Sequence, residues 1–184
     1  MDLVLVGPEI PHNAGCAARL AAALGLPLHL VRPLGFSLED RYLKRAGLDY
    51  WPLVELEVHD DLAALQRRLE GKSARPYVER LRLFTARGGE SLFETPFEAD
   101  DVLLFGSESR GLPASLLEQH PAARVYVPIR SGVRSLNLAN VACLGVYTAL
   151  VRAGVPLPAN QGAYQAHARA GEDVRPAERV READ

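Results

Sequence analysis

The sequence predicts an α/β fold, with a mostly parallel sheet that carries helices on both faces. Strand-like runs alternate with helical patterns and short loops join them, which is typical of a parallel sheet covered on both sides. The β-branched run Val125–Ile129 (VYVPI) indicates a buried strand. A polar loop and a long apolar helix follow that run, and together they predict a crevice at the carboxyl end of the sheet.

The first half of the chain alternates regularly between the two kinds of pattern. Strands are expected at Asp2–Val6, Leu28–Val31 and Leu53–Val58. Helices are expected at Ala14–Leu24, Glu39–Ala46 and Leu62–Glu70. Gly25 and Gly71 stand where the first and third of these helices end, and Asp60 or Asp61 is suited to cap the third.

The second half continues the alternation and ends in the longest helical pattern. Strands are expected at Leu81–Thr85, Val102–Phe105 and Val125–Ile129, with a short helix at Ser115–His120. The run from Leu138 to Val151 predicts a helix that Gly154 follows as a stop signal. Because this helix is apolar nearly all the way round, we expect the domain or a second subunit to cover it.

The composition changes near the C-terminus, so we divide the chain into a domain (1–157) and a polar tail (158–184). The tail is rich in Ala, Arg, Glu and Gly, and disorder is expected for much of it. A weak helix at Arg179–Glu182 is the alternative there.

Composition and charge exclude several classes of protein. The net charge of −2 means that nucleic-acid binding would depend on local basic clusters. Cys16 and Cys143 lie in apolar patterns and are interpreted as core residues, and the five histidines lack metal-ligand spacing, so no metal is expected. The N-terminus lacks the basic region of a signal peptide, and no apolar run reaches membrane-spanning length. A cytoplasmic location follows as the default expectation.

Three predicted strands lead into glycine-bearing polar loops: Thr85–Gly89, Gly106–Gly111 and Arg130–Ser135. Three such loops on one sheet edge would form a cradle for a nucleoside-like cofactor. A single loop of this kind favours an ordinary strand-to-helix turn, and for the three together the two interpretations are evenly balanced. The dinucleotide fingerprint and the P-loop motif are both missing, which counts against an oxidoreductase of the Rossmann or flavodoxin type and against a nucleotide hydrolase.

Several polar residues allow both a functional and a structural interpretation. Arg19 borders a helical stripe of Cys16, Leu20 and Ala23, and it would face either a phosphate, carboxylate or reacting hydroxyl, or a structural partner. Glu108 by itself is a solvated loop acid, and Ser135 and Asn137 by themselves are capping residues. Two basic clusters would grip phosphates or form a solvated surface; they are Arg41, Lys44 and Arg45, and Arg130 and Arg134.

Taken together, three stretches resemble the SpoU branch of the SPOUT methyltransferases. PEIPHNAGCAARLAAALG is similar to its first motif, with Asn13, Gly15 and Arg19 in order. LLFGSESRGLP is similar to the second. VYVPIRSGVRSLNLANVACLGVYTAL is similar to the third. The likeness is strongest to the short members of this branch and covers about residues 1–155.

The resemblance implies a fold, a cofactor and an assembly. The fold would be the SPOUT α/β-knot, in which the C-terminal segment forms a deep trefoil knot that pattern reasoning does not propose. The cofactor would be S-adenosyl-L-methionine, without a metal, contacted by Phe84, Gly106, Val127, Ser135 and Leu136. The working unit would be a homodimer whose active site draws on both subunits.

The resemblance also implies the reaction. It would be 2′-O-methylation of the wobble nucleotide (position 34, cytidine or uridine) in the anticodon loop of tRNA, leucine tRNAs in particular. Arg19 would be catalytic, with Asn13, Glu108 and Asn137 orienting it and the substrate, and Arg41, Lys44, Arg45 and Arg134 would contact RNA. The alternatives are a SpoU-type enzyme for another tRNA position or for ribosomal RNA, and a non-catalytic knotted module that binds RNA.

Overall fold

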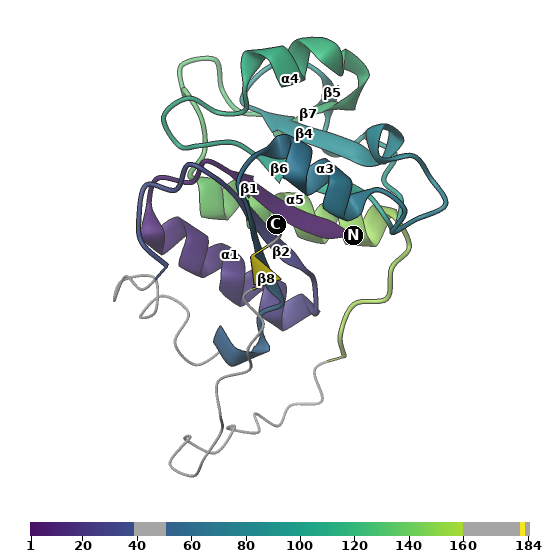
Figure 1. The fold of residues 1–184 in the computed structure, drawn as a ribbon. Coiled ribbons are helices and arrows are strands. Elements are labelled where there is room, and N and C mark those ends of the chain that lie inside the picture. Colours follow the sequence, from purple (N-terminus) through teal and green to yellow (C-terminus); the bar gives the residue numbers. More distant parts are fainter. Residues whose placement is uncertain (39–50, 160–180, 183–184) are drawn as a thin grey trace.

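All strands of the sheet run parallel, as the alternation of strand and helix patterns predicts. The computed structural model describes residues 1–38, 51–159 and 181–182 (Figure 1). In that part of the chain one sheet of eight strands has the order β5-β7-β4-β6-β1-β2-β3-β8, and each pairing between neighbours is parallel. The predicted fold class is therefore confirmed, while the trefoil knot stays a prediction.

Most of the predicted elements are present. The strands are β1 (Asp2–Val6), β2 (Leu28–Val31), β3 (Leu56–His59), β4 (Leu81–Thr85), β5 (Glu90–Ser91), β6 (Val102–Phe105), β7 (Arg124–Tyr126) and β8 (Arg181–Glu182). The α-helices of the described residues are α1 (Pro11–Leu24), α3 (Leu62–Leu69), α4 (Ala114–Gln119) and α5 (Leu138–Arg152). None of these helices is long and apolar enough to cross a membrane.

Some predicted boundaries were wrong. α1 begins at Pro11 rather than Ala14, because proline is favourable in the first turn of a helix. β3 begins at Leu56 rather than Leu53, because Trp51–Leu53 forms a 3₁₀ turn. β7 ends before Pro128, which has no backbone N–H for a sheet. The helix predicted at Glu39–Ala46 lies outside the described residues.

The two shortest strands differ from the sequence predictions. β5 was not expected at all, because two residues are too few to show an alternating pattern. β8 pairs with β3, with Arg181 opposite Glu57, where the sequence offered a weak helix. That helix prediction was wrong for these two residues, since it rested on weak propensity and the position beside a sheet edge decides their conformation.

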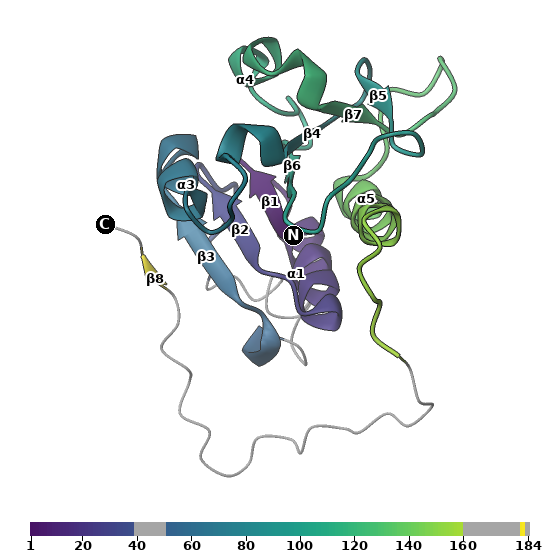
Figure 2. The same cartoon turned by 90° about the vertical axis from the view of Figure 1, so that its right-hand side faces the viewer.

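Two apolar layers hold the sheet between the helices. Leu3 and Leu5 of β1 belong to the layer under α1 and α5, whereas Val4 and Val6 belong to the layer under α3. This alternation follows from the two-residue period of a strand. Figure 2 shows α1 and α5 on one side of the central strands and α3 on the other.

The buried stripe of α1 is not the one that the sequence indicated. Ala14, Ala17, Ala18 and Ala21 face the sheet, while Cys16 is only half-buried and Ala23 is exposed. The helix is so rich in alanine that its hydrophobic pattern hardly distinguishes one face from another. Small residues on the true inner face let the helix pack closely against the sheet.

The last helix is buried on one side only. Its inner side contacts the sheet through Leu138, Ala142, Val146 and Ala149, among others. Its outer side exposes an apolar stripe, which we define as Cys143, Leu144, Tyr147 and Val151. The prediction that Cys143 is a core residue was therefore wrong within the single chain, because this position lies on the face that the sheet does not cover.

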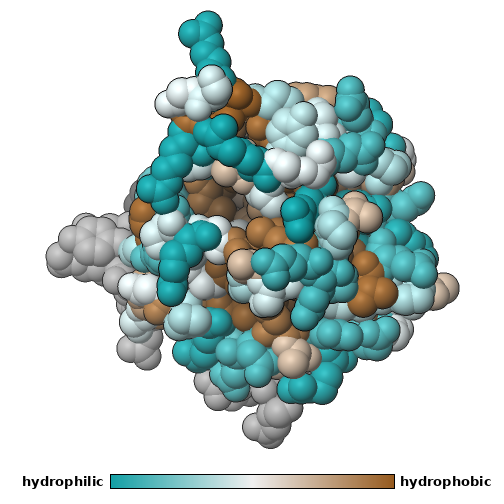
Figure 3. Space-filling view, turned by 90° about the horizontal axis from the view of Figure 1, so that it is seen from above, coloured by the Kyte–Doolittle hydropathy of each residue, from teal (hydrophilic) through white to brown (hydrophobic). Residues whose placement is uncertain are grey.

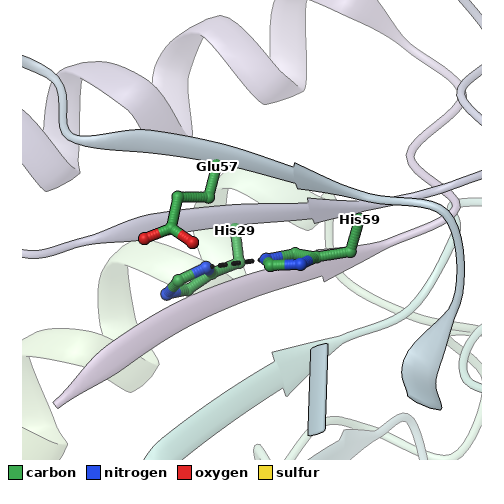
Figure 4. A group of neighbouring side chains, drawn as sticks. All are labelled: His29, Glu57 and His59. Atoms are coloured by element: carbon green, nitrogen blue, oxygen red, sulfur yellow. Dashed lines mark hydrogen bonds between the residues drawn. The ribbon is translucent and has the colours of Figure 1, made fainter. Parts of the chain in front are cut away.

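A buried chain of polar side chains crosses the α3 side of the sheet (Figure 4). His29 Nε2 lies 3.2 Å from Asp2 Oδ1, and His29 Nδ1 lies 3.0 Å from His59 Nε2. Because a carboxylate only accepts, His29 donates to Asp2, and when the His29 ring is neutral its Nδ1 accepts from His59. Glu57 lies close to both rings, but each of its oxygens accepts a 2.7 Å hydrogen bond from Arg68. Hydrogen bonds thus engage Glu57, His29 and the Nε2 of His59, whereas the buried His59 Nδ1 has no hydrogen-bond partner among the described residues.

We expect His59 to make the protein less stable as the pH falls from 6.5 to 4. Burial and the nearby His29 lower its pKa from 6.5 to about 4, so within this range the unfolded chain binds a proton that the folded chain does not. The loss in the free energy of unfolding should approach about 3 kcal/mol at the lower end. Urea titrations across this range measure it.

The same titrations on two variants identify the group responsible. His59→Gln should remove most of this pH dependence, because the glutamine amide can still donate to His29 but does not titrate. His120→Gln, at the end of α4, should keep it. An unchanged pH dependence in His59→Gln would contradict the assignment.

Candidate functional site

One cavity lies where the carboxyl ends of β4, β6 and β7 meet. It has a volume of about 270 Å³ and is bounded by parts of all three glycine-bearing loops that the sequence singled out. From above, a hollow with a hydrophobic floor opens between hydrophilic side chains (Figure 3). The predicted meeting of these loops at one sheet edge is therefore confirmed.

All five predicted cofactor contacts line this cavity: Phe84, Gly106, Val127, Ser135 and Leu136. The rings of Phe84 and Phe105 are stacked at its floor, with centroids 4.2 Å apart. Gly145 of α5 packs against them, and a Cβ there would lie 2.7 Å from Phe84 Cε1. The last helix therefore supports the apolar floor directly.

The loop after β6 folds back over itself at Gly106. Ser107 and Gly111 exchange backbone hydrogen bonds of 3.2 and 2.8 Å, which closes the loop. The chain then passes so close to Gly106 that a Cβ there would lie 2.0 Å from the carbonyl carbon of Gly111. Only glycine fits at this position, and the loop from Gly106 to Leu112 lines the cavity.

Three of the predicted catalytic residues form a hydrogen-bonded set. Asn13 Nδ2 donates to Glu108 Oε1 at 2.8 Å, and Asn137 Nδ2 donates to Asn13 Oδ1 at 3.0 Å. Glu108 also accepts from the backbone N–H groups of Glu9 and Ile10, at 2.8 and 3.2 Å. Since the side chain of Ile10 cannot cap α1, the carboxylate of Glu108 satisfies this helix end instead.

Asn137 joins this set to the last helix. Its Oδ1 accepts from the backbone N–H groups of Ala139 and Asn140, so it is also the N-cap of α5. The set therefore fixes the starts of α1 and α5 relative to the loop after β6. The structural interpretation of Asn137 as a capping residue is therefore confirmed, while its catalytic role stays a prediction.

Arg19 lies apart from this set. It follows Asn13 by six residues on α1, which corresponds to about 9 Å along the helix axis and a different face. Its side chain is exposed on the side of α1 that does not contact the sheet. Within one chain, the structure does not bring the arginine to the cavity that its proposed role requires.

The predicted RNA contacts divide into two groups. Arg134 is exposed at the rim of the cavity and donates to the carbonyl oxygen of Ser109 at 2.8 Å. Arg41, Lys44 and Arg45 lie outside the described residues. Two residues were assigned no specific role from the sequence: Arg110, a second-motif residue that lines the cavity, and Glu9, which lies outside the lining and accepts hydrogen bonds from Ser109.

Comparison with known proteins identifies the family. The model of the SpoU rRNA methylase family matches residues 1–147. The chain belongs to this family. The matched range includes the start of α1, the β6–α4 loop and most of α5, which the Asn13–Glu108–Asn137 set joins. The likeness predicted from the three motifs is confirmed.

Individual members of the SpoU family agree with this assignment. The tRNA (cytidine(34)-2′-O)-methyltransferase of Acidovorax sp. (strain JS42) is 45% identical over 148 residues, which span 80% of this chain and 88% of that protein. A solved structure concerned with 2-OH methylation of C/U34 on tRNA is 50% identical, covers 82% and 94% of the two chains, and has a TM-score of 0.74. Both support the closer likeness to the short members of the branch that the sequence indicated.

A more distant member of the family shares the fold. The SpoU methyltransferase AviRb from Streptomyces viridochromogenes, in complex with AdoMet, has a TM-score of 0.70 at 21% identity and covers 83% of this chain and 60% of that one. The arrangement of sheet and helices is therefore common to family members of quite different sequence.

Proposed function

We propose that this SpoU-family protein transfers a methyl group from S-adenosyl-L-methionine to the 2′-oxygen of nucleotide 34, cytidine or uridine, in tRNA. Leucine tRNAs are the proposed substrates, and the cytoplasm is where they would be modified. One observation carries the proposal. The Asn13–Glu108–Asn137 set stands beside a cofactor-sized cavity in a chain that is 45% identical to a tRNA (cytidine(34)-2′-O)-methyltransferase.

The cavity suits the proposed cofactor. A volume of about 270 Å³ is close to the lower end of cofactor pockets, which begin at roughly 300 Å³. The apolar floor of Phe84 and Phe105 fits a flat base, and polar residues of the loop after β6 line the cavity beside it. AdoMet is bound to AviRb, which has the same fold. No metal ion takes part in the proposed reaction.

The residues of the chain mainly align the reactants. The cofactor supplies a methyl group on a positively charged sulfur, so the protein must position the ribose hydroxyl and manage its proton. An arginine is a poor proton acceptor, because its pKa exceeds about 12. We therefore assign Arg19 to the phosphate beside the target ribose, while the Asn13–Glu108–Asn137 set keeps the surrounding helices in place.

Arg19 would act at the cavity of a second subunit in a homodimer. It is exposed on α1, and the neighbouring α5 carries the exposed stripe of Cys143, Leu144, Tyr147 and Val151. Val151 exposes 62% of its surface, which is unusual for a helix so rich in apolar residues. A second copy that packs on this stripe would cover it and place Arg19 near the site of its partner.

We expect Leu144→Glu to convert the protein to a monomer. A glutamate on the stripe would be buried without a partner in the dimer, so the dissociation constant should rise at least about 100-fold. Sedimentation velocity over a range of concentrations measures this change. Val78→Glu, at a more exposed apolar site in the turn before β4, should leave the assembly intact. A wild type that is monomeric at micromolar concentrations would contradict the homodimer.

Arg134 should contribute to tRNA affinity through a phosphate contact. We expect Arg134→Ala to weaken binding severalfold and to lower the slope of log Kd against log salt concentration by about 1. Filter binding between 50 and 200 mM salt measures both quantities. Arg67→Ala, an exposed site on α3, is the matched control. A salt slope equal to that of the wild type would contradict the contact.

Methyl transfer to total tRNA tests the proposed function directly. Purified protein, labelled S-adenosyl-L-methionine and bulk tRNA from a strain that lacks the enzyme should yield labelled 2′-O-methylcytidine and 2′-O-methyluridine. Mass spectrometry of digested tRNA should locate the label at position 34. The reaction should release S-adenosyl-L-homocysteine in an amount equal to the methyl groups transferred. Label only at another position, or only in ribosomal RNA, would overturn the assignment in favour of a different SpoU-type activity.

A further inference from the structure

Two loops far apart in sequence hold each other at the rim of the cavity. The carboxylate of Glu9, in the β1–α1 loop, accepts hydrogen bonds from Ser109 in the β6–α4 loop. The Ser109 hydroxyl donates to Oε1 at 2.5 Å and the Ser109 backbone N–H donates to Oε2 at 3.2 Å. Both carboxylate oxygens are therefore directed to one residue across a separation of 100 positions.

The contact is reciprocal and continues to the third loop. Glu108 directly precedes Ser109, and its carboxylate accepts hydrogen bonds from the backbone N–H groups of Glu9 and Ile10. The carbonyl oxygen of Ser109 accepts from Arg134 Nη2 at 2.8 Å. Glu9, Ser109 and Arg134 thus form a chain of contacts that joins the loops after β1, β6 and β7. Ser109 and Arg134 line the cavity, whereas Glu9 stands behind them.

The backbone of Glu9 is itself fixed by contacts with Gly35. A Cβ at Gly35 would lie 2.6 Å from the Cα of Glu9, so the backbone of residue 35 packs directly on it. Gly35 also donates its N–H to the carbonyl oxygen of Pro8 at 2.9 Å. The hydrogen bonds from Ser109 lower the pKa of the Glu9 carboxyl, which is therefore ionised at neutral pH. A charged acceptor on a fixed backbone makes a strong hydrogen bond.

We infer that Glu9 is a positioning residue that sets Ser109, and through it Arg134, at the mouth of the cavity. The inference rests on the proposed function and adds a residue that the motif comparison does not assign. Ordering this loop before the substrates arrive removes an entropic cost of binding. Loss of Glu9 should therefore raise the Kd of the cofactor and the KM of tRNA more than it lowers kcat.

Variants at Glu9 and Ser109 test this role. Glu9→Ala removes both acceptors and should raise the cofactor Kd about tenfold, whereas Glu9→Gln keeps one acceptor and should raise it only about threefold. Ser109→Ala removes the hydroxyl alone. If the two residues act as one unit, the double variant should bind no more weakly than Glu9→Ala. Calorimetry gives the Kd values, and Glu118→Ala on α4 is the control.

A second measurement separates this inference from the proposed function. In Glu9→Ala the amide hydrogen of Ser109 should exchange about tenfold faster, whether or not the protein methylates tRNA. A wild type that does not methylate tRNA would overturn the proposed function while exchange still tests the loop contact. An active wild type, combined with unchanged exchange and unchanged cofactor Kd in Glu9→Ala, or with additive effects in the double variant, would overturn the role of Glu9.

Discussion

Replacing Arg19 by alanine should remove methyl transfer while leaving cofactor binding nearly unchanged. The arginine lies on the exposed side of α1 and does not line the cavity of its own chain, so the cofactor loses no contact. The target ribose would lose the cation that holds its neighbouring phosphate, and we expect turnover to fall at least about 100-fold. Single-turnover assays with labelled cofactor measure the rate, and calorimetry measures the Kd.

Two further variants identify what the arginine contributes. Arg19→Lys keeps the charge but loses the planar fork that grips a phosphate, so it should recover only part of the activity. Arg67→Ala removes an equally exposed arginine from α3 and should behave as the wild type. Turnover of Arg19→Ala within tenfold of the wild type would contradict a catalytic role for this residue.

The order of elements could be predicted from the sequence because the pattern is strong. β1, β2, β4 and β6 have the predicted bounds, since each is a short apolar run between clear turn signals. The caps predicted at Asp61, Gly25 and Asn137 are also confirmed, whereas Ser135 does not cap the last helix. Asp61 accepts the N–H of Ala64 at 2.7 Å, and Gly25 adopts a left-handed conformation with φ of 65°. Local chemistry determines such features, so they can be read without knowledge of the fold.

Features that depend on strand register could not be predicted in this way. His29 and His59 are 30 residues apart and meet only because β2 and β3 pair with His29 opposite Glu57 and Val31 opposite His59. The contacts of Glu9 with Glu108 and Ser109 likewise depend on β1 and β6 lying side by side, which places their following loops together. The spacing of these residues along the sequence does not indicate either contact.

The candidate site includes features that could be predicted from the sequence and features that could not. Its three loops were found from glycine content and position after strands, and the motif resemblance supplied Asn13, Glu108 and Asn137, which the structure joins by hydrogen bonds. The face of α1 that carries Arg19 was misjudged, because an alanine-rich helix shows little hydrophobic contrast. Arg19 is exposed and does not line the cavity of its own chain, so its proposed role requires the cavity of a second subunit.

Gly106 is the position where one added methyl group should have the largest effect on the site. In Gly106→Ala the new Cβ would lie 2.0 Å from the carbonyl carbon of Gly111 and 2.1 Å from the nitrogen of Leu112. Both are backbone atoms, so no side-chain rotation relieves the contact and the loop over the cavity must open. We expect the cofactor Kd to rise at least about 100-fold, since the loop supplies much of the rim.

The matched control for this change is Gly132→Ala, because a Cβ at Gly132 meets no atom within 4 Å. That variant should bind the cofactor as the wild type does. The Gly106→Ala protein should still fold, since the overpacking is confined to one loop and overpacking typically costs about 1–3 kcal/mol. Far-UV circular dichroism checks the fold and calorimetry measures the Kd. A folded Gly106→Ala protein with wild-type cofactor affinity would mean that the loop after β6 does not form the binding site.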